Sequence, residues 1–320
     1  MRKVLCATTA LVALGGVSAA SADISVSAGN EFKYSSWSDN YSASNTANKT
    51  SAGSTTKYKI SASTVTDNGL TLSSYTAQDG TTGSFNDMGF SIGGDFGTIG
   101  FSGSESGDAF ETDSAVTADE GNSIKTTTTT ALEQLMPGKS ANGGSTVSYL
   151  SPNISGFQFA VGMKDTAGYD DGSQAGAQYS MTSGDTTVTI KYAVDNQGKA
   201  TSSNTEIEAT SAGLVVGYGD ATVTISSNTK SKGSTYDYSS DSIGLSYKVS
   251  DALTVAAYTG STEDSKDANH EITDTGLGFT YTITPGLSLS VTHNDWDVKD
   301  GTTSLNADGQ KTTVALDVSF

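Results

Sequence analysis

The sequence predicts an all-β fold, a 16-stranded antiparallel transmembrane β-barrel with a long third loop that folds inward. Segments in which apolar and polar residues alternate recur about every 19 residues, separated by clusters of Gly, Asn, Asp and Ser. The chain also ends on such a segment, with Val314, Leu316, Val318 and Phe320 on one face. The three prolines lie outside these segments, as expected where every backbone N–H needs a partner inside lipid.

The N-terminus has the pattern of a secretory signal peptide over residues 1–22. Arg2 and Lys3 supply the positive start, residues 4–17 an apolar stretch, and residues 20–22 a small-residue cleavage site. We therefore expect the mature domain to cover residues 23–320. The only cysteine, Cys6, lies in the segment to be removed, so the mature chain is expected to form no disulfide.

The mature chain is strongly acidic. Removal of Arg2 and Lys3 leaves 15 lysines, no arginine and 35 carboxylates, a formal net charge of −20. Nucleic-acid binding needs a basic footprint, so we expect no nucleic-acid partner.

The first five expected strands start near Asp23 and precede a very long loop. Residues 67–69 form a tight turn between the second and third strands, and Gly94 to Gly97 lead into the fifth. We expect these residues to face outward: Ile24, Val26, Ala28, Phe32, Tyr34, Tyr58, Ile60, Leu70, Leu72, Met88, Phe90, Ile92, Ile99 and Phe101.

The remaining eleven expected strands follow that loop and run to the C-terminus. Strands six to nine place these residues outward: Val147, Tyr149, Phe157, Phe159, Val161, Met163, Ala175, Ala177, Tyr179, Met181, Val188, Ile190, Tyr192 and Val194. Strands ten to fifteen place these outward: Ile207, Ala209, Val223, Ile225, Ile243, Leu245, Tyr247, Leu253, Val255, Leu277, Phe279, Tyr281, Leu287, Leu289 and Val291.

The connections alternate between two lengths. Short turns are expected at 67–69, 183–185, 219–220 and 284–286, and longer polar loops at 38–56, 195–204, 228–238 and 261–272. Outer-membrane barrels have short periplasmic and long extracellular ends. Because sixteen is even, both termini lie on one side and the first strand can pair with the last, which removes the exposed edges.

A barrel of sixteen strands is too wide for its own side chains to fill, so a channel remains. The connection 104–144 is much longer than an ordinary loop, and such length usually carries function. If it folds inward, it places carboxylates in the channel; if it is an ordinary extracellular loop, it does not. The carboxylates are Glu105, Asp108, Glu111, Asp113, Asp119, Glu120 and Glu133.

Five lysines have the parity of the channel wall. Lys33, Lys57 and Lys59 alternate with outward aromatic and aliphatic residues on the first two strands, and Lys164 and Lys191 do so on later strands. The alternative for each is a solvent-facing lysine at the rim.

Three further segments carry a family resemblance over the whole mature chain. Gly94 to Gly103, Ser145 to Pro152 with Gly156 and Phe157, and the terminal Phe320 resemble the general diffusion porins of Gram-negative outer membranes, in particular the alphaproteobacterial type. One feature departs from the family. Porins commonly follow the Phe-Gly-Thr strand with Gly-Arg and line the constriction with arginines, whereas here Ser104 follows Gly103.

The resemblance implies an exported multi-pass protein of the Gram-negative outer membrane. It implies a homotrimer, a third loop folded into each pore, and a field between loop carboxylates and basic wall residues. It also implies partners, namely outer-membrane lipid and lipopolysaccharide and the barrel assembly machinery. Phe320 would be the terminal aromatic that closes the barrel.

The resemblance and the charges together predict passive diffusion of ions and small hydrophilic solutes through a water-filled channel. Acidic rings favour cations, so we expect a mild cation preference. The alternative is a surface structural or adhesive outer-membrane protein without open-channel activity.

The sequence shows no catalytic constellation. Of the two histidines, His270 is expected in a loop and His293 on a lipid-facing position near a strand end, so we expect no enzymatic activity. No cofactor is expected to be required, although acidic clusters at Asp113, Asp119-Glu120 and Asp170-Asp171 could hold Ca²⁺ through oxygen ligands.

Overall fold

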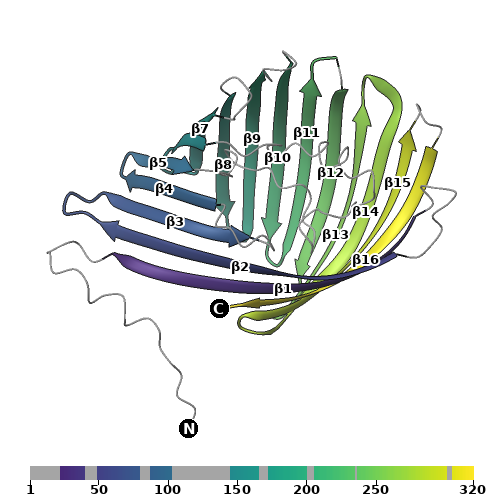
Figure 1. Ribbon diagram of the computed structural model, residues 1–320, viewed down its shortest axis with the longest axis horizontal. Helices are drawn as coiled ribbons and strands as arrows, with labels where there is room; N and C mark the ends of the chain where they lie inside the picture. Colours follow the sequence, from purple (N-terminus) through teal and green to yellow (C-terminus); the bar gives the residue numbers. More distant parts are fainter. Residues whose placement is uncertain are drawn as a thin grey trace, which may run out of the picture.

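A computed structural model describes residues 22–39, 49–79, 87–102, 145–165, 172–199, 205–234, 236–300 and 305–320. Within these ranges the chain forms sixteen antiparallel strands that close into one barrel (Figure 1). The strands are β1 (Asp23–Asp39), β2 (Lys49–Val65), β3 (Thr71–Asp79), β4 (Asp87–Gly94), β5 (Gly97–Ser102), β6 (Ser145–Leu150), β7 (Phe157–Asp165), β8 (Gly172–Ser183), β9 (Thr186–Lys199), β10 (Glu206–Tyr218), β11 (Ala221–Lys232), β12 (Tyr236–Lys248), β13 (Leu253–Asp264), β14 (Asp267–Thr284), β15 (Leu287–Asp300) and β16 (Leu305–Ser319). The predicted all-β fold, a 16-stranded antiparallel barrel, is confirmed.

Each strand pairs with its neighbour in sequence, and β1 pairs with β16 to close the barrel. At this seam Phe32 lies opposite Leu316 and Tyr34 opposite Val314. The backbone N–H of Phe320 donates to the carbonyl of Ala28 at 2.9 Å, and the N–H of Ala28 donates back at 3.4 Å. The backbone of Phe320 therefore belongs to the closing seam.

The outward face of the barrel is apolar and the inward face polar. Phe32 is 51% exposed, Ile190 52% and Leu277 63%, whereas the most deeply buried side chains are Thr224 and Ser226. This arrangement inverts that of a soluble protein, because the solvent of the outer face is lipid.

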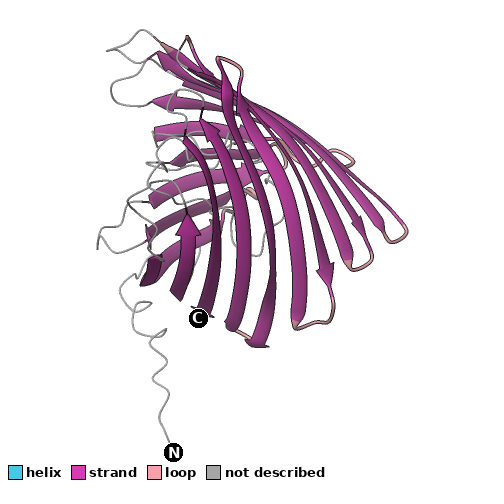
Figure 2. Cartoon of the chain, turned by 90° about the vertical axis from the view of Figure 1, so that its right-hand side faces the viewer, coloured by secondary structure: helices cyan, strands magenta, loops and turns pink. Residues whose placement is uncertain are grey.

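The wall differs in height around the barrel. Strands β3 to β7 have six to nine residues and form a low wall, whereas β8 to β16 have 12 to 18 and form a tall wall (Figures 1 and 2). At about 3.4 Å per residue and a tilt of about 40°, β14 rises roughly 45 Å, well above an apolar band of about 25 Å. The tall wall must therefore project beyond the membrane.

Tight turns join the strands at the end where β1 begins and β16 ends. Gly97 has φ +106°, and a Cβ there would collide with the carbonyl oxygen of Leu150. Gly286 has φ +80°, and a Cβ there would lie 2.6 Å from the carbonyl oxygen of Ser319. Glycine is required at both turns for its conformation and its size.

In the described ranges, no helix combines the length and the hydropathy needed to span a membrane.

Two sequence predictions are wrong, and the first concerns the lengths of the loops. The expected loops 38–56, 195–204, 228–238 and 261–272 are shorter than predicted, because the strands continue into them; β13 reaches Asp264 and β14 already begins at Asp267. Apolar alternation marks a strand only where its outer face meets lipid. The second error is on β10, where the register places Ile207 and Ala209 on the inward face and Leu214 and Val216 outward.

Candidate functional site

The lumen of the barrel is lined by the residues that alternate with the exposed apolar ones. Lys33 lies between Phe32 and Tyr34, which are 51% and 44% exposed, and its Cα partner on β16 is Ala315, which is buried. Lys57 and Lys59 likewise flank Tyr58, which is 45% exposed. The β-pleat therefore directs these three lysines into the lumen.

The two later wall lysines have the same parity. Lys191 lies between Ile190 and Tyr192, both about half exposed, and pairs with Gln178 on β8. The amide Nε2 of Gln178 donates to Oε1 of Gln158 at 2.9 Å, so a row of polar side chains crosses β7, β8 and β9. Lys164 follows the outward Met163, which gives its backbone the lumen parity, but its side chain lies outside the described residues.

Three lumen lysines were missed by the sequence analysis. Lys230 and Lys232 follow the inward parity of the buried Thr224 and Ser226 on β11, and Lys311 follows that of Thr313 on β16. This part of β11, residues 226–232, is polar on both faces, so the alternation of apolar and polar residues gives no signal there. Only the register of β11 with β10, which the structure supplies, reveals their inward parity.

The periplasmic rim is the end of the barrel that carries the tight turns. Away from this rim, the described lumen wall is not acidic. Seven lysines in regular register face inward: Lys33, Lys57, Lys59, Lys191, Lys230, Lys232 and Lys311. Five carboxylates with described side chains share that face: Glu31, Asp195, Asp264, Asp274 and Asp317. The register gives the backbone of Asp39, Asp79, Asp87 and Asp300 the same inward parity, as it does for Lys164. Nζ of Lys33 lies 3.1 Å from Oε1 of Glu31, and Nζ of Lys59 lies 4.8 Å from the centroid of the Tyr75 ring.

The carboxylates of the tall wall are concentrated on its outer face. Outward positions of β10 and β12 to β16 carry Glu208, Asp237, Asp241, Glu263, Glu271, Asp295, Asp297 and Asp308. On β15 the outward Lys299 lies beside one of these acids, with its Nζ 2.6 Å from Oε2 of Glu271. The net charge of the chain is therefore a poor guide to the charge of the lumen wall.

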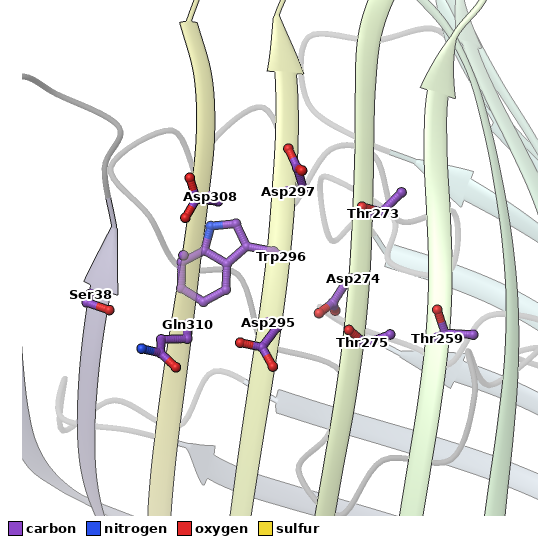
Figure 3. A pocket seen from close by; sticks show the side chains of 11 residues that line it. Ser38, Thr259, Thr273, Asp274, Thr275, Asp295, Trp296, Asp297, Asp308 and Gln310 are labelled. Atoms are coloured by element: carbon purple, nitrogen blue, oxygen red, sulfur yellow. The ribbon is translucent and has the colours of Figure 1, made fainter.

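An open depression of about 650 Å³ lies on this acidic outer face (Figure 3). Its labelled side chains come from β13 to β16, with Ser38 from β1, and include Asp295, Asp297 and Asp308. Most of the lining residues have the outward parity, so the depression does not belong to the channel.

A hydrogen-bonded group on the lumen face of the tall wall holds one carboxylate. The hydroxyl of Tyr258 donates to Oδ2 of Asp274 at 2.5 Å, and Nδ2 of Asn294 donates to the same hydroxyl at 2.5 Å. Tyr258 pairs with Gly276, which pairs with Asn294, so the ring can cross β14 only because Gly276 has no side chain.

At the periplasmic rim, Lys248 at the end of β12 and Asp251 in the following turn form an ion pair. Nζ of Lys248 donates to Oδ1 of Asp251 at 2.8 Å. This hydrogen bond, together with the lysine's charge, lowers the pKa of Asp251 below its ordinary value.

The predicted acidic residues of the long loop lie outside the described residues. This holds for Glu105, Asp108, Glu111, Asp113, Asp119, Glu120 and Glu133. It also holds for the clusters named for Ca²⁺ and for the predicted signal peptide up to residue 21. Their roles stay predictions.

Comparison with known proteins gives one family and several similar folds. The model of the family described as Gram-negative porin matches residues 7–301. No curated protein sequence matches at a significant level.

Among solved structures, the chain is similar to the anion-selective porin from Comamonas acidovorans, at 13% identity and a TM-score of 0.66 over 93% of this chain and 100% of that one. It is similar to the outer membrane channel DcaP of Acinetobacter baumannii, at 14% identity and 0.67 over 93% and 97%. It is also similar to the trimer form of OmpT, an outer membrane protein of Vibrio cholerae, at 12% identity and 0.62 over 93% and 99%. At these identities the likeness establishes the fold.

Proposed function

Because the chain belongs to the Gram-negative porin family, we propose that this outer-membrane channel conducts ions and small hydrophilic solutes by passive diffusion. The observation that carries the proposal is a closed barrel of sixteen strands whose inward face is polar and charged. A barrel of this size leaves an aqueous channel between its walls.

Export through a cleaved signal peptide over residues 1–22 is part of the same proposal. That the chain catalyses no reaction stays a prediction. So do its contacts with lipopolysaccharide and the barrel assembly machinery.

We propose further that the channel prefers cations mildly, and that loop 104–144 decides this preference. The described lumen wall carries lysines and carboxylates in similar numbers, so by itself it gives little preference for either sign of ion. The loop adds seven carboxylates against Lys125 and Lys139. If the loop lines the pore, its charge outweighs that of the wall. The similar porin from Comamonas acidovorans is anion-selective, which fits the view that this fold accommodates either preference.

The zero-current potential of the refolded protein in a planar bilayer under a KCl gradient tests this proposal. We expect a potential that favours K⁺ in the wild type. Replacing the seven loop carboxylates by their amides should reverse its sign. The matched control is the triple substitution D295N/D297N/D308N, which removes acids from the outer face and should leave the potential unchanged.

Each outcome separates the parts of the proposal. An unchanged potential after loop neutralisation would contradict the role of the loop. Folded wild-type protein without any conductance would contradict the channel and favour the alternative, a surface structural or adhesive protein.

The outward face of β3 supports a homotrimer. Ser74 and Thr76 face outward at the height of the apolar band, since they pair with Phe90 and Met88 on β4. Gln78 continues the row beside Tyr58 of β2. Polar groups at this height are unfavourable against lipid and are better satisfied by another protein. We therefore place the contact between copies at β2 and β3.

The substitution S74L/T76L/Q78L makes this face compatible with lipid and should yield monomers. The mass of the detergent-solubilised protein measures the change, and S227L/T229L, outward on β11 above the apolar band, is the control. Trimers that persist in the triple variant would exclude this face. A monomeric wild type would exclude the trimer while leaving the channel intact.

A further inference from the structure

We propose that Tyr75 is a positioning residue that holds the ammonium of Lys59 against the lumen wall as a fixed positive charge. The proposal rests on the channel proposed above, since Lys59 matters to function only if the lumen conducts. Three observations carry it: the register of β2, β3 and β4, the distance between the ammonium and the ring, and the absence of a side chain at residue 89.

The register brings the two residues together diagonally. Lys59 is paired with Ala77, and Ser61 is paired with Tyr75, so Tyr75 lies one rung away on the same inward face. Diagonal neighbours on adjacent strands are within reach of long and aromatic side chains. Ala77 is small, and it leaves the space opposite Lys59 open. The lysine side chain can therefore lean toward the tyrosine.

The geometry is that of a cation–π contact. Nζ of Lys59 lies 4.8 Å from the centroid of the Tyr75 ring, inside the limit of about 6 Å for this interaction. The aromatic face carries the negative part of the ring quadrupole, which attracts the ammonium. Lys59 is exposed to the lumen, so the contact competes with water.

Gly89 makes room for the ring. It is paired with Tyr75 across β3 and β4. A Cβ at residue 89 would lie 3.0 Å from Cζ and 3.2 Å from Cδ1 of Tyr75, and closer still to Cε1. The ring therefore lies over the backbone of Gly89. Any side chain there would push it from the position in which it meets Lys59.

The consequence is a defined position for a side chain that is otherwise flexible. A free lysine ammonium is a point charge on four rotatable bonds. At an exposed site, a cation–π contact favours the held conformation about twofold to fivefold over the released one. The positive charge of Lys59 is thus kept at one height of the lumen wall.

The first test is spectroscopic and does not need conduction. Lysines of the folded protein are reductively ¹³C-dimethylated, which keeps their charge, and the Lys59 signal is assigned with K59Q. We expect an upfield ring-current shift of this signal in the wild type and in Y75F. The shift should vanish in Y75L and in G89A. Heat-modifiable migration on gels verifies that each variant is folded.

The second test measures exposure of the amine. If the held conformation does not react, release should accelerate acetylation of Lys59 about threefold to sixfold in Y75L relative to the wild type. Lys33 on β1 serves as the internal reference. Y75F should react like the wild type, because it keeps the aromatic face.

The third test connects the pair to ion flow. Y75L should change the zero-current potential in the wild-type background and leave it unchanged in the K59Q background. An unshifted Lys59 signal in the wild type, or equal acetylation rates in the wild type and Y75L, would overturn the positioning role. A protein that shows the shift but carries no current would retain the contact and refute the channel instead.

Discussion

Replacing Tyr258 by phenylalanine should lower the free energy of unfolding by about 2.5 kcal/mol. The substitution keeps the ring and removes only the hydroxyl, which donates to Oδ2 of Asp274 and accepts from Nδ2 of Asn294, each at 2.5 Å. Asn294 is 6% exposed, so water replaces the lost partner poorly. A hydrogen bond to a charged group contributes about 1.5–3 kcal/mol and a neutral one about 1 kcal/mol. Because Asp274 is only partly buried, we take the lower part of the summed range.

Urea-induced unfolding in lipid vesicles, followed by tryptophan fluorescence, measures this change. Trp296 lies two residues from Asn294 on β15 and is 5% exposed, so its emission should report the loss of the wall. The control is Y281F, which removes the hydroxyl of an outward tyrosine on β14; this residue is 44% exposed. It should change the free energy of unfolding by less than about 0.5 kcal/mol. Equal effects of Y258F and Y281F would refute the argument that this hydrogen-bonded group stabilises the tall wall.

Four further predictions concern other parts of the barrel. G276A should destabilise the barrel at least as much as Y258F in the same urea assay, because its Cβ would collide with the Tyr258 ring and lie 2.5 Å from Nδ2 of Asn294; unchanged stability would show that the ring can move aside. Deletion of Phe320 should reduce the yield of heat-modifiable barrel, since it removes both backbone hydrogen bonds to Ala28; full yield would contradict its role in closure. Mass spectrometry of protein from the outer membrane should find a chain that starts at Asp23, and a chain retaining residues 1–22 would contradict cleavage. Chelation with EDTA should lower the thermal midpoint if the acidic clusters outside the described residues hold Ca²⁺, and an identical midpoint would exclude a stabilising site.

The outward and inward faces of a strand could be predicted from the sequence wherever the barrel meets lipid. Phe157, Phe159, Val161 and Met163 alternate strictly, and the structure exposes all four on the outer face of β7. Lipid demands an apolar residue at every outward position, so the pattern is periodic and the inward parity of Lys33, Lys59 and Lys191 follows from it.

The same reasoning failed where lipid ends. On β11 the outward residues after Ile225 are Ser227 and Thr229, so both faces are polar and no period remains. Sequence alternation therefore predicts a loop at Lys230 and Lys232, whereas the structure places both in the wall. On β10 the isolated Ile207 suggested an outward position, but it faces the lumen beside Lys232. A single apolar residue carries no parity information when its neighbours are polar on both faces.

The sequence by itself determined the class of the protein. Alternation over sixteen segments, the terminal Phe320 and the very long connection 104–144 are local features, and each has a direct physical cause in the bilayer or in chain length. Only the tertiary structure decided where the charges lie. The mature chain carries a net charge of −20, yet closure of the barrel turns most acids of the tall wall outward and seven lysines inward. That partition depends on the register between strands far apart in sequence, and register is fixed by hydrogen bonding across the closed sheet rather than by composition.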